Sequence, residues 1–470
     1  MKEHDTTSLT AQSASAGNSR LTERSALALR HVLRGELIAP GHDAYDQARR
    51  VWNGHIERFP ALIARCAGAA DVQHAVRFAR EHDLLLSVRG GGHSAPGYGT
   101  NDGGLVIDLS RQQGIRVDPR ASTVQVQGGV LWRDLDEEAQ AFGLATTGGM
   151  VSSTGVGGLT LGGGLGWLMG KYGLTVDNLL AADVVTADGQ LRRASEREHP
   201  DLFWALRGGG GNFGVVTSLE LRLHPVSAVL GGMLVYPLNQ AREVLRFYRD
   251  FCRELPDEAE AHVALLTGSD GIPVLALMLG YNGSFTQGER VLAPARGFGR
   301  PLADLIAVMP YAVRQRLMDE PNARHGLHRY WRSAFIDVLS DELIECLCDA
   351  AATFVSPLSA LLLFYLHGAA TRVPAEETAF AARRAQWDFD VISQWTSDVD
   401  AGEQIQWVRN VWKVVTPFVK GSAYVNHLSP DDRVEKVRAS FAVNHARLRA
   451  VKGTYDPNNL FRLNANISPG

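Results

Sequence analysis

Cysteine is scarce in this sequence, and the few cysteines lie far apart. The 470 residues include four of them, Cys66, Cys252, Cys346 and Cys348. This number and spacing exclude a disulfide framework. Cys346 and Cys348 have no further cysteine or histidine cluster nearby, so they predict buried thiols in a helix rather than metal ligands. We therefore expect no metal site.

Long apolar runs and an excess of one charge are also missing. No run reaches the length that a membrane-spanning helix needs. The 47 Lys and Arg residues against 51 Asp and Glu leave a net charge of −4, which favours neither nucleic acid nor an anionic membrane as a partner. The first twenty residues are polar and lack the apolar core of a signal peptide. We expect residues 1–30 to form a disordered leader and the protein to be cytoplasmic.

The composition is that of an ordinary globular protein, with 45% hydrophobic and 21% charged residues, and the length suits two or three packed modules. From Ala61 onward, strand-like runs alternate with helical periodicity and with glycine-dense loops. Glycine then thins out after Pro225, which predicts a domain boundary there. Residues 226–420 read as alternating strands with amphipathic helices, the pattern of an antiparallel sheet backed by helices.

The stretch LLLSVRGGGHSAPGYG, residues 84–99, places three glycines directly before His93. A dinucleotide-binding fold would need G-x-G-x-x-G at the start of a helix, but turn-forming residues follow here. The Rossmann fold is therefore excluded. Two readings stay open on spacing alone: a tight turn with a surface histidine, or a nest of backbone N–H groups around a diphosphate, with His93 beside it.

Two further glycine loops favour the second reading. Residues 148–166 hold nine glycines, and RGGGGNFGVV at 207–216 repeats the pattern. Glycine at this density lets the backbone approach a flat, bulky ligand closely and leaves many amides free. Three such loops in one alternating module predict a single extended nucleotide cofactor.

Several long motifs together resemble one protein family. SVRGGGHS, GLVIDLS, GVGGLTLGGGLGWL, DLFWALRGGGGNFGVVT and the tail YDPNNLFRLNANISP resemble the berberine bridge enzyme-like flavoproteins. These belong to the superfamily of vanillyl-alcohol oxidase and p-cresol methylhydroxylase (PCMH). The similarity begins near residue 35, keeps the family's order, and is greatest to the bacterial type, which includes 6-hydroxy-D-nicotine oxidase-like and polyketide-tailoring enzymes.

The resemblance implies an α+β fold with a two-part, PCMH-type FAD-binding domain and an inserted substrate domain. We expect the FAD-binding domain at residues 31–225, and a substrate domain of antiparallel sheet and helices at 226–424. The tail, 425–470, would complete the FAD-binding domain as a berberine-bridge-like segment, and its end, FRLNANISP, would be a strand that closes back on the flavin.

The resemblance also assigns residues to the cofactor. His93 would be bonded covalently to the 8α carbon of FAD, beside amides that hold the diphosphate, those of Arg89, Gly90, Gly91, Gly92 and Ser94. Val151 stands where many relatives have a second linking cysteine, so one covalent bond is expected. Further flavin contacts are expected from Gly148, Gly149, Val151, Thr154, Gly155, Gly158, Leu159, Gly214, Val216 and Asn464, with Asn466 as the alternative to Asn464.

Candidate catalytic residues follow from the same comparison. Thr154 occupies the family's oxygen-access position, where its hydroxyl could bond oxygen or a flavin–oxygen adduct, or only the local backbone. GSAYVNHLS resembles the family's Tyr-x-Asn motif and predicts a strand with Tyr424 and Asn426 on one face. Tyr424 would be the base or a substrate-orienting phenol, and Asn426 would contact the flavin; His427 departs from the family's aromatic residue.

The same alternation puts Tyr365 and His367 on one face of another strand. They are predicted to line the substrate side of the sheet, with Tyr330 or Arg332 as further candidates.

The resemblance implies an FAD oxidase that takes hydride from a small, cyclic or aromatic, hydroxylated metabolite and passes the electrons to oxygen, giving hydrogen peroxide. A flavin-dependent oxygenase of a polyketide-like or other secondary metabolite, a dehydrogenase with another acceptor, and a non-catalytic flavin-binding protein remain alternatives. The expected partners are a small-molecule substrate and molecular oxygen, with the chain a monomer or homodimer.

Overall fold

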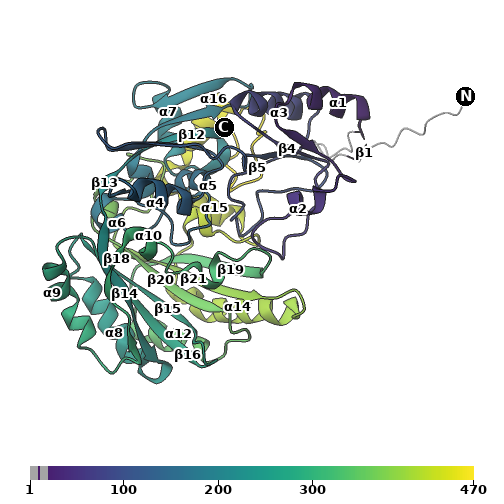
Figure 1. Ribbon diagram of the computed structural model, residues 1–470. Helices are drawn as coiled ribbons and strands as arrows, with labels where there is room; N and C mark the ends of the chain where they lie inside the picture. Colours follow the sequence, from purple (N-terminus) through teal and green to yellow (C-terminus); the bar gives the residue numbers. More distant parts are fainter. Residues whose placement is uncertain (1–8, 11–19) are drawn as a thin grey trace, which may run out of the picture.

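A computed structural model describes residues 9–10 and 20–470. Figure 1 shows two parts. The upper part contains the purple-to-teal first half of the chain and the yellow tail with the C-terminus, whereas the green middle of the chain forms the lower part. The upper part is therefore built from two segments that are distant in the sequence.

The upper part begins with a four-stranded sheet. β3 (Glu36–Ile38) pairs antiparallel with β4 (Leu62–Arg65), while β4 and β5 (Leu86–Arg89) both run parallel to β6 (Leu105–Asp108). Helix α3 (Ala69–Glu81) joins β4 to β5. Its buried residues recur at helical spacing, which explains why this segment forms an amphipathic helix: Val72, Ala75, Val76 and Ala79.

A five-stranded antiparallel sheet lies beside it, in the order β11-β10-β12-β8-β7. Its strands are β7 (Ile115–Asp118), β8 (Thr123–Gln127), β10 (Leu179–Val185), β11 (Leu191–Ser195) and β12 (Val215–Arg222). A glycine turn joins β10 to β11, where Gly189 adopts φ +75°.

The lower part is one large antiparallel sheet in the order β17-β14-β16-β15-β20-β21-β19, with β18 also paired to β14. Its strands are β14 (Ala228–Pro237), β15 (Ala259–Thr267), β16 (Pro273–Tyr281), β17 (Ala303–Asp304), β18 (Ala307–Pro310), β19 (His328–Ile336), β20 (Ala360–Leu366) and β21 (Gln386–Trp395). Helices α8 (Ala241–Cys252), α9 (Phe285–Arg296), α12 (Asp341–Ala351) and α14 (Ala401–Val415) pack on one face in a shared core. The antiparallel sheet backed by helices confirms the predicted α+β fold class.

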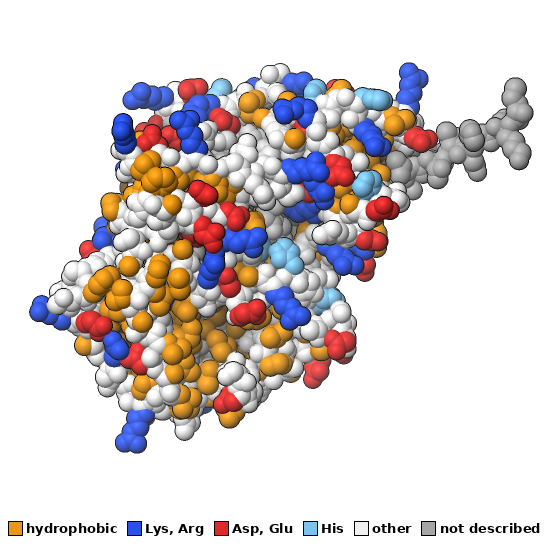
Figure 2. All heavy atoms as spheres, viewed as in Figure 1, with side chains coloured by type: hydrophobic (Ala, Val, Ile, Leu, Met, Phe, Trp, Pro, Cys, Tyr) orange, Lys and Arg blue, Asp and Glu red, His pale blue; other side chains and the backbone are white. Residues whose placement is uncertain are grey.

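The other face of this sheet is turned toward the first part. Alternation along β20 divides its side chains: Leu361, Leu363 and Tyr365 enter the helix-covered core, while Leu362 and Phe364 belong to a cluster with residues of the upper part. At the edge of the large sheet formed by β17 and β18, the side chains of Leu305 and Val308 are more than half exposed. Figure 2 shows hydrophobic side chains gathered in the region of β14 and β18.

The tail returns to the upper part as α15 (Val434–Phe441) and α16 (His445–Tyr455). Lys452 of α16 is fully buried, and its Nζ donates to the carboxylate of Asp456 at 2.6 Å and to the carbonyls of Asn212 and Phe461. One buried cation thus connects the third glycine loop to the end of the chain.

The remaining elements are short or connect the sheets. They are β1 (Leu9–Thr10), β2 (Arg20–Leu21), α1 (Glu23–Val32), α2 (Tyr45–Arg49), α4 (Trp132–Gln140), β9 (Leu144–Ala145), α5 (Val156–Leu161), α6 (Met169–Tyr172), α7 (Pro200–Leu206), β13 (His224–Pro225), α10 (Tyr311–Arg314), α11 (Asp319–Asn322) and α13 (Ala369–Arg372). Within the two described ranges, no helix combines the length and apolar character needed to cross a membrane.

Three predictions about local structure need correction. The disordered leader over residues 1–30 is wrong from Thr22 onward, because Thr22 caps helix α1 and Leu29 is buried; residues 1–8 and 11–19 lie outside the described residues. The strand predicted around Tyr424 is a short 3-10 turn, Val425–His427. The tail after residue 460 has no strand; it is irregular backbone held by side-chain hydrogen bonds, including those of Asn212 to Ala465 and Ile467.

Candidate active site

A cavity of about 340 Å³ lies between the two parts. The glycine loops, the tail and the inner face of the large sheet all contribute to its wall. Most of the predicted cofactor contacts are among its lining residues, namely Arg89, Gly90, Gly91, Gly92, His93, Ser94, Val151, Thr154, Gly155, Gly158, Leu159, Gly214, Val216, Tyr424, Asn426 and Asn464. The fold thus brings together three glycine loops that are separate in the sequence.

Two of these loops touch through their backbones. A Cβ added to Gly91 would lie 2.4 Å from the amide nitrogen of Gly155, and a Cβ on Gly155 would lie 2.4 Å from that of Gly91, so only glycine permits this approach. Gly158 and Gly211 also line the cavity, but a Cβ there would meet no protein atom within 4 Å. Side chains at these two positions would fill space that the cavity keeps open for a ligand.

His93 lies at the end of the first glycine loop. Its ring stacks on Trp52, with centroids 4.7 Å apart, and its Nε2 lies 2.8 Å from the hydroxyl of Ser153. Burial, together with the nearby His325 and Arg329, holds the pKa of His93 well below its usual value. The imidazole is therefore neutral at physiological pH, the form in which a ring nitrogen is nucleophilic.

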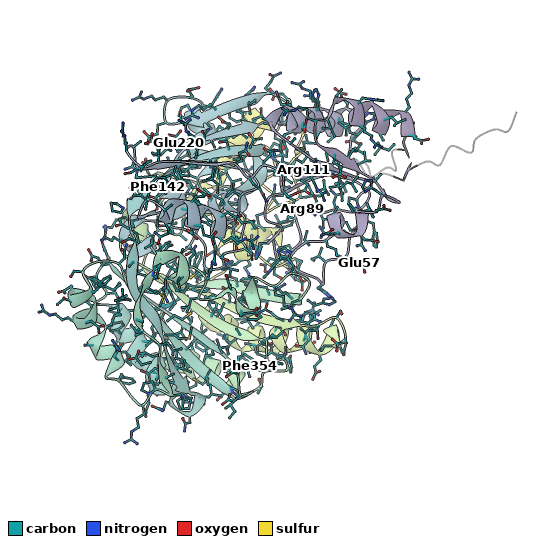
Figure 3. All side chains as sticks on the ribbon, in the orientation of Figure 1. Glu57, Arg89, Arg111, Phe142, Glu220 and Phe354 are labelled. Atoms are coloured by element: carbon teal, nitrogen blue, oxygen red, sulfur yellow. The ribbon has the colours of Figure 1, made fainter. Side chains whose placement is uncertain are left out.

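Charged and amide groups hold the loops at both ends of the cavity. Arg89, labelled in Figure 3, ends β5; it pairs with buried Asp108 at 2.8 Å and donates to the carbonyl of Arg50, so it holds the start of the first loop in place. Asn464 donates to the carbonyls of Gly211 and Phe461, while its buried side-chain oxygen has no partner within the described part of the chain. An orphaned acceptor beside a glycine loop fits a ligand that carries hydrogen-bond donors.

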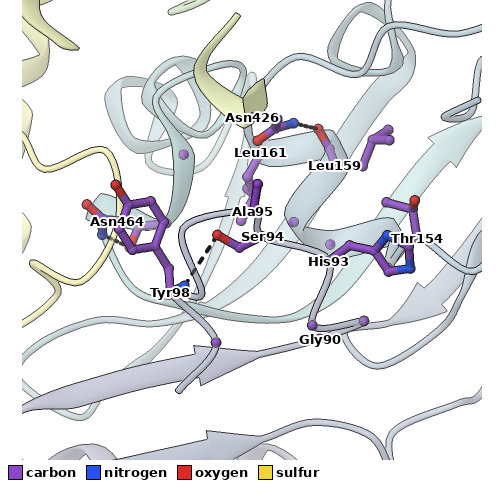
Figure 4. A pocket seen from close by; sticks show the side chains of 18 of the residues that line it. Gly90, His93, Ser94, Ala95, Tyr98, Thr154, Leu159, Leu161, Asn426 and Asn464 are labelled. Atoms are coloured by element: carbon purple, nitrogen blue, oxygen red, sulfur yellow. Dashed lines mark hydrogen bonds between the residues drawn. The ribbon is translucent and has the colours of Figure 1, made fainter. Parts of the chain in front are cut away.

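Thr154 and Asn426 flank the central part of the cavity (Figure 4). The Thr154 side chain lies near the ring of His93 in this view, and its hydroxyl forms no hydrogen bond with any described residue. Asn426 donates to the carbonyl of Leu159 at 3.1 Å. Thr154 is thus available to a ligand, whereas Asn426 joins the tail to the second glycine loop.

Tyr424 and Asn426 are neighbours, as predicted, but through a turn rather than a strand. The Tyr424 hydroxyl accepts hydrogen bonds from Asn426 at 2.7 Å and from the amide of Gly164 at 2.9 Å. Burial raises the pKa of Tyr424 despite these two donors. The phenol is neutral at physiological pH, and both donors point at its oxygen.

His427 belongs to a buried cluster that the sequence analysis did not find. Its Nδ1 lies 2.9 Å from a carboxylate oxygen of Asp388 and 3.1 Å from one of Asp390. Burial by itself would lower the pKa of His427, but the attraction of the two carboxylates for the charged ring is stronger and raises that pKa to about 10. Burial and the neighbouring Asp390 raise the pKa of Asp388 to about 6.

Strand alternation explains how two acids come to lie in this place. Along β21, Trp387, Phe389 and Val391 enter the helix-covered core, so Asp388 and Asp390 face the other side. Trp331 donates its indole N–H to Asp390 at 2.8 Å. Its ring also contacts that of His427, with centroids 4.7 Å apart and planes tilted by 45°. A useful signal was present in the sequence: WDFDVISQW carries two acids at alternate positions of an otherwise apolar strand.

The inner face of the large sheet supplies the rest of this wall. Side chains of Trp331, Leu362, Phe364 and Ile392 line the cavity beside His427, with Met318 from a neighbouring loop. This end is mostly apolar, and two titratable rings line it, those of His427 and Tyr424, with centroids 4.8 Å apart. Asp388, Asp390 and His427 also meet the distance criteria for a cation site, although no metal was expected. The imidazole lies between both carboxylates, so the three groups already neutralise much of one another's charge.

Other predicted site residues lie elsewhere. Gly148 and Gly149 do not line the cavity; Gly148 packs against Trp132 and Gln315. Tyr365 and His367 stack on each other, but Tyr365 lies in the helix-covered core, on the opposite face of β20 from the cavity. The expectation that this pair lines the substrate side is wrong, because two faces of similar apolar character could not be told apart in the sequence.

The remaining candidates are also absent from the cavity lining. Tyr330 and Arg332 do not line the cavity, and the residue between them, Trp331, does. Asn466 is likewise absent from the lining, in contrast to Asn464.

Comparisons with known proteins agree with this arrangement. Family models match at residues 60–195, described as an FAD binding domain, and at 423–468, described as berberine and berberine like. An FAD-linked oxidoreductase of Dictyostelium discoideum is 33% identical over 93% of this chain and 95% of its own length. (R)-6-hydroxynicotine oxidase of Paenarthrobacter nicotinovorans is 32% identical over 93% of this chain and 97% of its own.

Solved structures show the same fold. The crystal structure of 6-hydroxy-D-nicotine oxidase from Arthrobacter nicotinovorans superposes with a TM-score of 0.85 at 32% identity, covering 93% of this chain and 98% of that one. Chitooligosaccharide oxidase, at 22% identity, has a TM-score of 0.84, covers 95% of this chain and 100% of its own, and shows the likeness of fold alone. FAD is the cofactor that the glycine cavity fits. The chain belongs to the berberine bridge enzyme-like family of FAD-linked oxidoreductases.

Proposed function

We propose that the protein is an oxidase of a small, cyclic or aromatic, hydroxylated metabolite, with FAD attached by a single covalent bond at His93 and oxygen as the electron acceptor. The observation that carries the proposal is the cavity itself. Its glycine loops leave room for an extended nucleotide, and beside His427 and Tyr424 its wall is mostly apolar. When bound, FAD supplies the redox chemistry, taking hydride from a substrate carbon and giving the electrons to oxygen.

The single attachment is argued from two residues of the lining. His93 offers a neutral, buried imidazole beside the first glycine loop. Val151 lines the same cavity at the position where many relatives have a second linking cysteine, and valine has no nucleophile. One bond at His93 is therefore the chemistry that this chain's residues support.

The substrate's proton needs an acceptor near its reacting carbon. Nδ1 of His427 contacts the Asp388 carboxylate, so the protonation of these two groups is coupled. With its pKa raised to about 10, the His427 ring is protonated at physiological pH, and its Nε2–H donates to the substrate and orients it. The next proton taken up by the pair goes to Asp388, with a pKa of about 6. An acceptor whose pKa lies near the working pH is the most effective kind.

Tyr424 was expected from the sequence to be the base or a substrate-orienting phenol. Its raised pKa keeps the phenol protonated, and two N–H donors already point at its oxygen. These contacts suit a group that positions the loop of Gly164 and the bound flavin. We therefore assign proton acceptance to the His427 cluster and positioning to Tyr424.

An oxygenase is the second candidate, favoured by one observation. The Thr154 hydroxyl lines the cavity near His93 and has no hydrogen bond within the described residues, so it is free to bond an oxygen species. Retention of oxygen in the product would follow from that role.

A substrate screen tests these alternatives. Candidate compounds are mixed with the holoprotein without air, and loss of the oxidised flavin absorbance identifies a substrate. Oxygen is then admitted, and peroxide yield and incorporation of heavy oxygen into the product are measured. An oxidase gives one peroxide per substrate and no label in the product. Labelled product favours the oxygenase, and reduction that needs another acceptor for turnover contradicts both.

A further inference from the structure

The inner face of the large sheet surrounds a buried acid with apolar side chains. The strand register pairs Asp390 of β21 with Leu362 of β20. On β19, Trp331 pairs with Ile392, which makes it the diagonal neighbour of Asp390 on the same face. Leu362, Trp331 and Ile392 all line the cavity. The wall beside His427 is therefore an apolar surface with one acid beneath it.

Trp331 offers this wall a flat surface without hydrogen-bonding groups. An indole has one such group, its N–H, and here it donates to Asp390 at 2.8 Å. This hydrogen bond fixes the direction of the ring plane, and the ring of His427, with its centroid 4.7 Å away, contacts the indole as well. The side chain is only half-buried. The surface that remains for a ligand is thus planar and apolar.

Few polar groups near this wall could meet a substrate. Arg89 is the only Arg, Lys, Asp or Glu among the described residues that line the cavity, and it belongs to the first glycine loop. Asn322 lines the cavity too, but its Nδ2 donates to the carbonyl of Met318 and its Oδ1 accepts from Gln394. A sugar would lose water from several hydroxyls without gaining partners, at a cost of about tenfold in affinity for each. A single polar edge is satisfied at His427.

We propose that Trp331 is the platform on which a flat substrate ring lies, and that Asp390 is the positioning residue that holds its indole in place. The inference rests on the oxidase proposed above and narrows its substrate to a planar, apolar ring with one polar edge, which excludes sugars. The polar edge meets His427 while the ring stacks on Trp331. Stacking of two aromatic rings adds about fivefold to affinity beyond what the buried area supplies.

The test measures binding to the FAD-loaded protein and needs no turnover. Phenol and cyclohexanol are similar in size and carry one hydroxyl each, but only phenol is flat, so the ratio of their dissociation constants isolates the stacking contact. Flavin absorbance reports binding in the cavity. Fluorine NMR of protein labelled with 5-fluorotryptophan reports on Trp331, whose signal among the nine tryptophans is assigned with Trp331→Phe.

Wild type is expected to bind phenol about fivefold more tightly than cyclohexanol, and at least about a hundredfold more tightly than xylose. Phenol is also expected to shift the Trp331 signal. Trp331→Leu replaces the flat face with a branched side chain and is expected to lose the preference for phenol over cyclohexanol. Trp331→Phe keeps a flat ring and is expected to keep most of that preference. Flavin retained by each variant shows that it is folded.

Two variants of Asp390 test the positioning role. Asp390→Leu removes the acceptor of the indole N–H and is expected to move the Trp331 signal in the absence of ligand and to reduce the preference for phenol. Asp390→Asn keeps an oxygen for the indole and is expected to restore both. Trp412→Leu is the control, since this residue of α14 does not line the cavity, and it is expected to leave the preference unchanged.

Equal binding of phenol and cyclohexanol by wild type, or a Trp331→Leu protein that keeps the preference, overturns the platform. The platform is also overturned if phenol changes flavin absorbance without moving the Trp331 signal, or if xylose binds as tightly as phenol. An unchanged Trp331 signal in Asp390→Leu overturns the positioning role. Absence of flavin reduction and of peroxide in the substrate screen contradicts the proposed oxidase but not these binding results, so the two failures are distinguishable.

Discussion

Asp388→Asn is the sharpest perturbation of the proposed proton acceptor. With the pKa of Asp388 at about 6, the carboxyl is ionised to about 91% at pH 7 and about 9% at pH 5, so the rate of flavin reduction is expected to be roughly tenfold lower at pH 5 in wild type. The amide cannot take the proton, so Asp388→Asn is expected to lower the rate at pH 7 by about 10²–10⁴-fold and to remove this acid limb. The pKa of His427 is expected to fall, since one of the two carboxylates that raise it is gone.

Anaerobic stopped-flow measurement of flavin reduction across pH 5–9 checks this expectation once a substrate is known. Asp431→Asn is the matched control: this carboxylate bonds Tyr330 and Arg409, does not contact His427, and does not line the cavity. The control is expected to keep both rate and acid limb. A wild-type rate profile in Asp388→Asn would refute the assignment of the proton acceptor.

Further changes test other parts of the account. Tyr424→Phe removes one hydroxyl and is expected to slow flavin reduction about tenfold, the size of a lost positioning hydrogen bond; a 10²–10⁴-fold loss would return the role of base to Tyr424. His93→Ala is expected to release all flavin on acid denaturation, and any flavin still bound would place the link elsewhere. Removal of residues 455–470 takes Asp456 and Asn464 from the glycine loop and is expected to abolish FAD retention; a yellow, active truncation contradicts this. Lys452→Met leaves the carboxylate of Asp456 buried without its cation, and thermal unfolding should show a loss of about 3–5 kcal/mol, whereas an unchanged midpoint contradicts it.

The glycine loops were predictable because glycine density reports directly on close backbone approach. The spacing around His93 alone left two interpretations open, a tight turn and a diphosphate nest, and the two further glycine loops favoured the nest. The single link came from the family resemblance at Val151 and stays a prediction. The three glycine loops converge on one cavity in the structure, which supports the predicted nucleotide cofactor.

The substrate side could not be predicted in the same way. Strand alternation places residues on two faces, but it does not say which face is covered by helices, so Tyr365 and His367 were assigned to the wrong side of β20. Asp388 and Asp390 went unnoticed because their partner, His427, comes from a turn about 40 residues later.

The most direct test of the central claim needs no knowledge of the substrate. The holoprotein is reduced chemically without air, freed of excess reductant and mixed with oxygen in a stopped-flow instrument, while flavin absorbance and peroxide are measured. The account predicts reoxidation faster than that of free reduced FAD under the same conditions, with one hydrogen peroxide per flavin. A flavin that stays reduced in air, or returns to the oxidised form without peroxide, would contradict it.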